Sequence, residues 1–152
     1  MEMDATVGAA VRAAHPDDRA AVERLLAEAG LPADGLGEQF GEAYAVAEAD
    51  GRLVGAEGIE VYGGNGLLRS AVVAPEWRGR GVGEALTRER LEWARARGLR
   101  AVYLLTTTAP DFFARFGFRR IERSTAPRAI ADSVEFSLTQ CASAAVMRLD
   151  LP

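Results

Sequence analysis

The stretch between Val72 and Gly83 constrains the fold of this chain more than any other segment. An apolar run ends at Val73, Pro75 interrupts it, and glycines then stand at the alternate positions 79, 81 and 83. Beyond them the apolar residues follow a helical period, so the stretch predicts a strand, a proline break, a glycine-rich loop and a helix. A chain with this junction near its middle needs both a sheet and packed helices.

The same loop is suited to binding an anion. Gly79, Gly81 and Gly83 have no Cβ, so their backbone N–H groups can approach a ligand closely. The positive end of the following helix favours negative charge, and Arg78 and Arg80 add guanidinium groups that match phosphate oxygens. The loop therefore predicts a phosphate or pyrophosphate site. The alternative is a turn that only packs the helix against the strand, because short glycine motifs are weak signals.

Composition narrows the chemistry further. The chain has 18 Arg and no Lys, which excludes a Schiff-base lysine, a pyridoxal-phosphate anchor and a Walker A loop. Its one His, His15, and its one Cys, Cys141, cannot form a zinc site or an internal disulfide, so we expect no metal. The net charge of −4 argues against a nucleic-acid partner. No apolar run approaches ~18 residues, so we expect no membrane span and a cytoplasmic location.

The rest of the chain alternates between strand and helix patterns. Apolar residues at 22, 25, 26 and 29 have helical spacing, and this helix should be capped by Asp17 or Asp18 and end at Gly30. Further strands are expected at 11–14, 44–49, 52–61, 67–73, 101–105, 118–122 and 142–149, and helices at 33–39, 81–97 and 110–116. The pair Asp50-Gly51 predicts a hairpin turn, which makes the middle an antiparallel meander and disfavours a dinucleotide-binding Rossmann site. Residues 125–139 give no clear pattern.

These elements predict an α+β fold, with a mixed central sheet of six or seven strands flanked by about four helices. No linker or internal repeat divides the sequence, so residues 1–152 should form a single domain. The sheet edges and the final strand could support a homodimer.

Two motifs make the chain resemble a known enzyme family. Residues 78–83, Arg-Gly-Arg-Gly-Val-Gly, match the R/Q-x-x-G-x-G/A signature of the GNAT (Gcn5-related) N-acetyltransferases, and residues 112–118 resemble their second signature, a short helix ending in Gly-Phe. The resemblance covers about residues 11–122. It implies the GNAT acyltransferase fold, acetyl-CoA as donor and transfer of the acetyl group to an amine. The implied cofactor-binding residues are Val73, Arg78, Gly79, Arg80, Gly81, Val82, Gly83 and Phe113.

A narrower resemblance concerns the acceptor. Residues 67–70, residues 104–109 and the tail around Glu135 and Cys141 are similar to a subgroup named as arsenic-resistance N-acetyltransferases. This implies acetylation of a small amine or amino-acid-like toxicant. Direct arsenite binding is not implied, because a lone Cys is more often a small core residue.

The family pattern leaves the proton transfers open. The usual acid for the leaving thiolate is a Tyr at the position of Phe113, which has no proton to give. For the base, Glu57 and Glu60 lie on one predicted strand and should point to opposite faces. We choose Glu60 as the catalytic base, although a solvated strand glutamate is an equal alternative for either.

The substrate is expected to contact Arg69, Ser70 and Glu135. Arg69 could hold a carboxylate, arsonate or phosphonate through two hydrogen bonds, or it could be a charge on the solvent face of its strand. Two other functions stay open: an acetyl-CoA-binding GNAT module with weak catalysis, and a protein N-terminal acetyltransferase.

Overall fold

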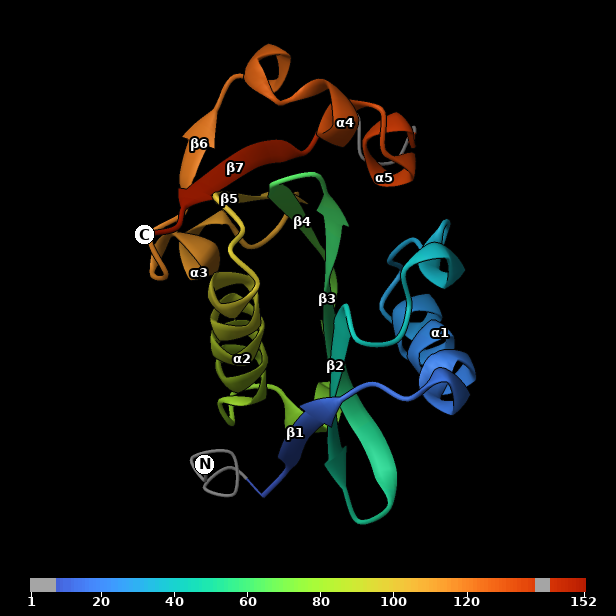
Figure 1. Cartoon of the computed structure of the whole chain (residues 1–152). Helices are drawn as coiled ribbons and strands as arrows, with labels where there is room; N and C mark the ends of the chain where they lie inside the picture. Colours follow the sequence, from blue (N-terminus) through green and yellow to red (C-terminus); the bar gives the residue numbers. More distant parts are fainter. Residues whose placement is uncertain (1–7, 139–142) are drawn as a thin grey trace.

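In a computed structural model that describes residues 8–138 and 143–152, seven strands form one sheet in the order β1-β2-β3-β4-β5-β7-β6 (Figure 1). The β4–β5 pair is parallel and the other pairs are antiparallel. The strands are β1 (Ala10–Ala13), β2 (Tyr44–Ala49), β3 (Arg52–Tyr62), β4 (Asn65–Val73), β5 (Ala101–Thr106), β6 (Arg119–Ile121) and β7 (Ala145–Asp150). The helices of the described chain are α1 (Arg19–Glu28), α2 (Val82–Ala96), α3 (Pro110–Ala114), α4 (Arg128–Ala131) and α5 (Val134–Ser137). The predicted α+β fold is confirmed, and α4 and α5 fill the stretch that gave no sequence pattern.

The helices cover both faces of the sheet. Helices α2 and α3 lie on one face and α1 on the other, while α4 and α5 lie near the turn between β3 and β4 (Figure 1). Buried apolar residues fill both sides, with Leu26 and Val46 in the cluster next to α1, Leu91 in the cluster below α2, and Ile130 and Phe136 in a third cluster near β5 and β7. No helix in the described residues is long and apolar enough to cross a membrane.

The predicted helix at 33–39 is wrong in extent. Only one turn of 3-10 helix forms, at Leu36–Glu38, and Gly35 precedes it with a φ of 76°. Two glycines in this short segment, Gly35 and Gly37, lower the helix propensity, and the left-handed backbone at Gly35 prevents a longer helix. The final strand, predicted at 142–149, is observed at Ala145–Asp150. Residue 142 lies outside the described residues.

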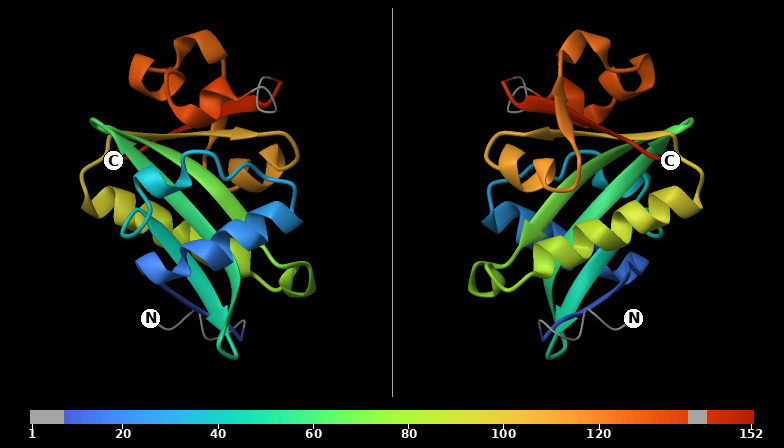
Figure 2. Two further views of the ribbon diagram at one scale, coloured as in Figure 1. Left: turned by 90° about the vertical axis from the view of Figure 1, so that its right-hand side faces the viewer. Right: turned by 90° about the vertical axis from the view of Figure 1, so that its left-hand side faces the viewer.

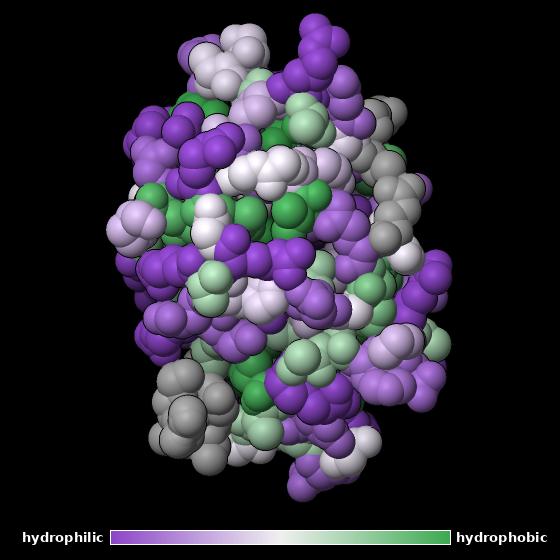
Figure 3. Space-filling model, in the orientation of Figure 1, coloured by the Kyte–Doolittle hydropathy of each residue, from purple (hydrophilic) through white to green (hydrophobic). Residues whose placement is uncertain are grey.

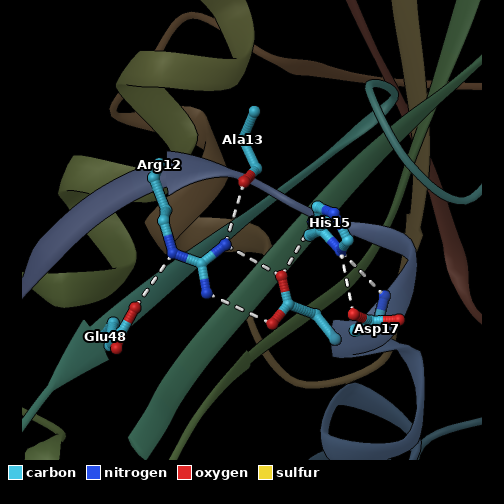
Figure 4. A network of polar contacts seen from close by, with 6 residues as sticks. Arg12, Ala13, His15, Asp17 and Glu48 are labelled. Atoms are coloured by element: carbon cyan, nitrogen blue, oxygen red, sulfur yellow. Dashed lines mark hydrogen bonds and ion pairs between the residues drawn. The ribbon is translucent and has the colours of Figure 1, made fainter. Parts of the chain in front are cut away.

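Asp18, one of the two predicted cap residues, stands at the N-cap of α1 but makes no side-chain capping bond there. His15 caps the preceding 3-10 turn, Pro16–Asp18, as Figure 4 shows. The imidazole Nδ1 of His15 accepts the N–H of Asp17 at 3.2 Å, and the Asp18 carboxylate accepts the N–H of His15 at 2.8 Å. Arg12 of β1 holds the same Asp18 carboxylate and also donates to Glu48 of β2 at 2.9 Å. The Arg12 hydrogen bond lowers the pKa of Asp18 against the opposing effect of burial. This network fixes the first strand pair to the helix, so His15 has a capping role.

Candidate active site

The sheet is interrupted where β4 and β5 separate. The two strands pair only along Asn65–Leu68 of β4 and Ala101–Leu104 of β5, after which they diverge. Figure 2 shows the two groups of strands, β2–β4 and β5–β7, fanning apart from this point. In addition β4 contains a bulge, because Gly58 faces Arg69 whereas Ala56 faces Val72. The extra residue re-aims the side chains of this part of β4.

A cavity of about 620 Å³ occupies this divergence. Its wall is built from β3, β4, β5, the beginnings of α2 and α3, the segment after α1, and α5. Among the residues in the wall are Ser70, Val73, Arg78, Gly83, Thr106 and Phe113. Apolar side chains also gather over α3 and β5 on the face seen in Figure 3. Phe112 and Phe116 are half-buried. One hollow therefore connects the glycine-rich loop with the interior of the sheet.

The glycine-rich loop presents unpaired amides at one end of this cavity. The first intrahelical bond of α2 runs from the N–H of Ala85 to the carbonyl of Gly81, at 3.0 Å. The N–H groups of residues 82–84 therefore have no carbonyl acceptor within the helix and can bind an anion. Arg78 lies beside them and donates from Nε to the carbonyl of Val73 at 3.1 Å. The φ of Gly81 is 88°, a left-handed backbone that favours glycine at this position.

Not every predicted residue of the loop reaches the wall. Gly79, Arg80, Gly81 and Val82 do not line the cavity, whereas Val73, Arg78, Gly83 and Phe113 do. The Arg80 guanidinium lies over the Trp77 ring, 4.6 Å from its centre. Val82 is buried in the core on the sheet side of α2. A phosphate contact of Arg80 therefore stays a prediction, and Val82 has a packing role.

The opposite end of the cavity is polar and centres on Arg69. Its side chain is almost fully buried, and the guanidinium donates to Ser70 Oγ at 3.1 Å, Glu60 Oε2 at 3.4 Å and the carbonyl of Pro32 at 3.3 Å. Ser70 sits at the bulge with a φ of 60°. Because these contacts come from β3, β4 and the segment after α1, Arg69 is held firmly and is not a solvent-face charge.

Glu135 reaches the same end from α5. It is buried, and its Oε1 has no hydrogen-bond partner among the described residues. Burial raises the pKa of Glu135 to about 7, with Arg69 opposing this shift and Glu60 adding to it. The predicted substrate residues Arg69, Ser70 and Glu135 therefore lie together on the cavity wall, although 65 residues of sequence separate Ser70 from Glu135.

Glu57 and Glu60 point to opposite faces, as strand alternation predicted. Glu60 is not in the cavity wall, and its two oxygens are used by the Tyr62 hydroxyl at 2.7 Å and by Arg69. Glu57 does line the cavity and faces α2, where the Thr87 hydroxyl donates to its Oε1 at 2.9 Å. Burial raises the pKa of Glu57 to about 8, partly opposed by Thr87 and Arg90. Glu60, the predicted base, therefore lies outside the cavity wall, whereas Glu57 belongs to it.

Sequence patterns missed the partners of these carboxyl groups. Thr87 is fully buried against Glu57, and nothing in the stripe of α2 identifies it as more than a helix position.

Phe113 is buried in the wall and packs edge-on against Phe112, with ring centres 5.0 Å apart. Tyr103 is buried but does not line the cavity. No phenol hydroxyl therefore belongs to the described wall.

Comparison with known proteins decides the family. The family model described as "Acetyltransferase (GNAT) domain" matches residues 40–120, which are 81 of the 152 residues. This chain belongs to the GNAT acetyltransferase family. Acetyl transfer from acetyl-CoA to an amine is the activity of a GNAT enzyme, as the glycine-rich motif predicted. The described residues hold no group of three or more His, Cys, Asp or Glu that could bind a metal ion, and Cys141 lies outside them.

Solved structures share the GNAT fold over most of this chain. The Mycobacterium tuberculosis protein Rv2747 in complex with CoA and NLQ is 26% identical, with a TM-score of 0.78 over 94% of this chain and 99% of its own. N-acetylglutamate synthase of Neisseria gonorrhoeae, complexed with coenzyme A and N-acetyl-glutamate, is 22% identical with a TM-score of 0.78, covering 95% of this chain and 35% of its own. The Escherichia coli ribosomal-protein-S18-alanine N-acetyltransferase is 17% identical with a TM-score of 0.72 and 93% coverage of both chains. The chain thus spans about a third of the synthase.

Proposed function

We propose that this GNAT protein transfers the acetyl group of acetyl-CoA to the amino group of a small compound that also carries an acidic group, as α-amino acids do. One observation carries the proposal. A single cavity joins the unpaired amides at the start of α2 to a buried Arg69 and a buried Glu135, whose Oε1 has no partner among the described residues. A donor with a diphosphate fits the first end, and an acceptor with one anionic and one cationic group fits the second.

The donor end fits acetyl-CoA. The diphosphate would lie on the amides at positions 82–84 beside Arg78, where Gly83 leaves space at the wall. The part of β4 beyond Leu68 no longer pairs with β5, so its backbone up to Val73 is available to the amides of the pantetheine arm. Phe113 would contact the thioester end. Gly79 and Gly81 would shape the loop, and Arg80 and Val82 would support it from outside the cavity.

The acceptor end fits an amino acid. Within the described residues three of the five N–H groups of Arg69 are bonded, which leaves two for a carboxylate. Glu135 Oε1 would accept a hydrogen bond from the substrate ammonium and take its proton, so Glu135 replaces Glu60 as the proposed base. Glu60 would instead orient Arg69, with Ser70 on its other side. Crystallisation of the related synthase with N-acetyl-glutamate supports this substrate class.

The same end of the cavity supports a narrower proposal about the substrate. A guanidinium that binds a carboxylate also suits an arsonate or phosphonate, so amino acids with such side chains, as expected of an arsenic-resistance acetyltransferase, belong among the proposed substrates. We further propose that residues 1–152 form one GNAT domain that acts in the cytoplasm, as a homodimer if the sheet edges pair.

Two other functions make different predictions. A GNAT module with weak catalysis would bind acetyl-CoA without releasing CoA. A protein N-terminal acetyltransferase, like the Escherichia coli enzyme for ribosomal protein S18, would prefer peptides with a free amino terminus. The cavity end formed by Arg69, Glu135 and the segment after α1 favours a small acidic acceptor over both.

The test combines binding and turnover. Acetyl-CoA binding is measured by isothermal titration calorimetry, and CoA release is followed with a thiol reagent across α-amino acids, their decarboxylated amines, amino acids with phosphonate or arsonate side chains, and short peptides. We expect release with one or more amino acids and little with the matching amines. Binding without release on any acceptor would replace the proposal by the weakly catalytic module. Release with peptides alone would replace it by protein acetylation.

A further inference from the structure

Two side chains of the cavity wall, Glu57 and Glu135, each have one buried carboxyl oxygen, Oε2 and Oε1 respectively, without a hydrogen-bond partner among the described residues. An unsatisfied buried oxygen is costly, so each such atom needs a reason. The acceptor amine gives one for Glu135. It gives none for Glu57, whose side chain lies on the other face of the sheet, against Thr87 of α2.

The position of the Glu57 side chain is fixed by burial and by one hydrogen bond. Its side chain is almost completely buried, and Thr87, which is fully buried, donates to Oε1. A donor at Oε1 leaves Oε2 as the oxygen that carries a proton when Glu57 is neutral. No group of the described residues accepts that proton, and the Glu57 side chain belongs to the cavity wall.

Acetyl transfer is faster when a proton donor lies near the leaving sulfur. Breaking the thioester produces a thiolate, and protonation of the leaving group lowers the barrier. Among the described residues, four ionisable side chains line the cavity: Glu57, Arg69, Arg78 and Glu135. The two arginines do not release protons in proteins, and Glu135 lies beside Arg69 at the acceptor end. Phe113, which packs in the cluster below α2, has no proton to give.

We propose that Glu57 is the catalytic acid that protonates the leaving sulfur, with Thr87 as its positioning residue. The inference rests on the proposed function, since it concerns the acetyl-transfer step of that same cavity.

The step balances without a further reactant. The amine nitrogen bonds to the acetyl carbon, the carbon–sulfur bond breaks, and its electron pair goes to sulfur. The proton on Glu57 Oε2 goes to the sulfur, which leaves as a thiol, and the amine proton goes to Glu135. After the products leave, Glu57 takes up one proton and Glu135 releases one to water. The substrate ammonium has also lost one proton to water, through Glu135, before its nitrogen attacks, so each turnover releases one proton in total.

The protonation state of Glu57 suits this role. Burial raises its pKa to about 8, which keeps the carboxyl group protonated at neutral pH. A thiol has an ordinary pKa of about 8.5, so proton transfer from Glu57 to a thiolate is nearly balanced. The Thr87 hydroxyl and Arg90 oppose the shift and Glu89 adds to it, all three from α2.

The test uses Glu57→Gln, Thr87→Val and the matched control Glu92→Gln, whose side chain is exposed on α2. Gln has the shape and charge of the neutral carboxyl group, so folding and acetyl-CoA affinity by calorimetry should stay within twofold of wild type. We expect kcat of Glu57→Gln to fall about 100-fold, the usual size of a general-acid effect. We expect the rate of wild type to fall above pH 8, and this fall should disappear in the variant. Thr87→Val should show a smaller loss, and Glu92→Gln none.

The outcomes separate the two proposals. A Glu57→Gln variant with kcat within twofold of wild type overturns the acid role while acetyl transfer stands. A loss of kcat with an equal loss of acetyl-CoA affinity, or with an unchanged pH profile, also overturns it, since Glu57 would then be structural. If wild type and Glu92→Gln both bind no acetyl-CoA and release no CoA, the proposed function itself is wrong and the acid role falls with it.

Discussion

Arg69 is a buried cation whose contacts come from three segments of the chain. A flat guanidinium can hold a carboxylate through two parallel hydrogen bonds, whereas a lysine ammonium cannot. We therefore expect Arg69→Lys to raise the KM for the amino-acid acceptor about tenfold or more by removing one charge-assisted hydrogen bond. The matched measurement uses the decarboxylated amine, whose KM should not change. Equal effects on both acceptors would show that Arg69 does not contact the carboxylate.

Phe113 offers a second test at the residue scale. Its ring lines the cavity on the face where Glu57 supplies the proposed proton. Phe113→Tyr should change kcat little in the wild-type background, because an acid is already present. In the Glu57→Gln background the added phenol should recover about tenfold of the lost rate, as a replacement proton donor. Steady-state CoA release of the four proteins gives the answer, and equal effects of the tyrosine in both backgrounds would contradict it.

At the scale of elements, the start of α2 is the proposed site of cofactor binding. A Cβ at Gly83 would lie 3.7 Å from Phe112 and Val73, an ordinary contact, so Gly83→Ala and Gly83→Glu should both fold. A carboxylate in the first helical turn even favours the helix. It would nevertheless lie where the diphosphate binds, and like charges in contact cost several kcal/mol, which predicts a Kd for acetyl-CoA about 100-fold higher.

The alanine variant is the control for this prediction, because it adds bulk without charge. Calorimetric titration should give Gly83→Ala an affinity within a few-fold of wild type. An unchanged affinity in Gly83→Glu would mean that the diphosphate does not lie at this helix end.

Local sequence signals determine the strands and helices that build the site. They do not determine that β4 and β5 diverge. Glycine and proline at 75–83 end one strand and begin one helix, and alternation placed Glu57 and Glu60 on opposite faces. The divergence of β4 from β5 and the bulge at Ser70 depend on how seven strands twist together. No local pattern encodes them, and without them the cavity would not exist.

At the scale of the whole molecule, buried carboxyl groups set how stability depends on pH. Burial raises the pKa of Glu57 to about 8 and of Glu135 to about 7. A raised pKa means that the folded state holds protons the unfolded state has lost. The stabilising contribution is therefore complete below the ordinary value of 4.5 and is lost as pH rises through 7 and 8. Asp18, whose pKa is lowered, contributes in the opposite direction at acidic pH.

Thermal unfolding followed by circular dichroism should therefore give the highest Tm near about pH 5 and a lower Tm near about pH 9. In Glu57→Gln, which cannot ionise, the fall should be smaller, so the variant should be more stable than wild type at the alkaline end. At the acidic end the two proteins should be similar. A Tm of wild type that rises from pH 5 to pH 9 would show that Glu57 and Glu135 are not buried as described.

The sequence by itself determined the α+β elements and the family, and it indicated the proposed donor end of the site, because hydrophobic period, glycine, proline and motif spacing act between near neighbours in the chain. It also selected Arg69, Ser70 and Glu135 as candidates, without their arrangement. Only the tertiary structure decided that these residues share one cavity and that Glu60 accepts hydrogen bonds from Arg69 and Tyr62. It also decided that Glu57 and Glu135 each keep one oxygen without a partner among the described residues. Desolvation and hydrogen bonding set the chemistry of a carboxyl group, and both depend on residues that are distant in sequence and meet only in the folded chain.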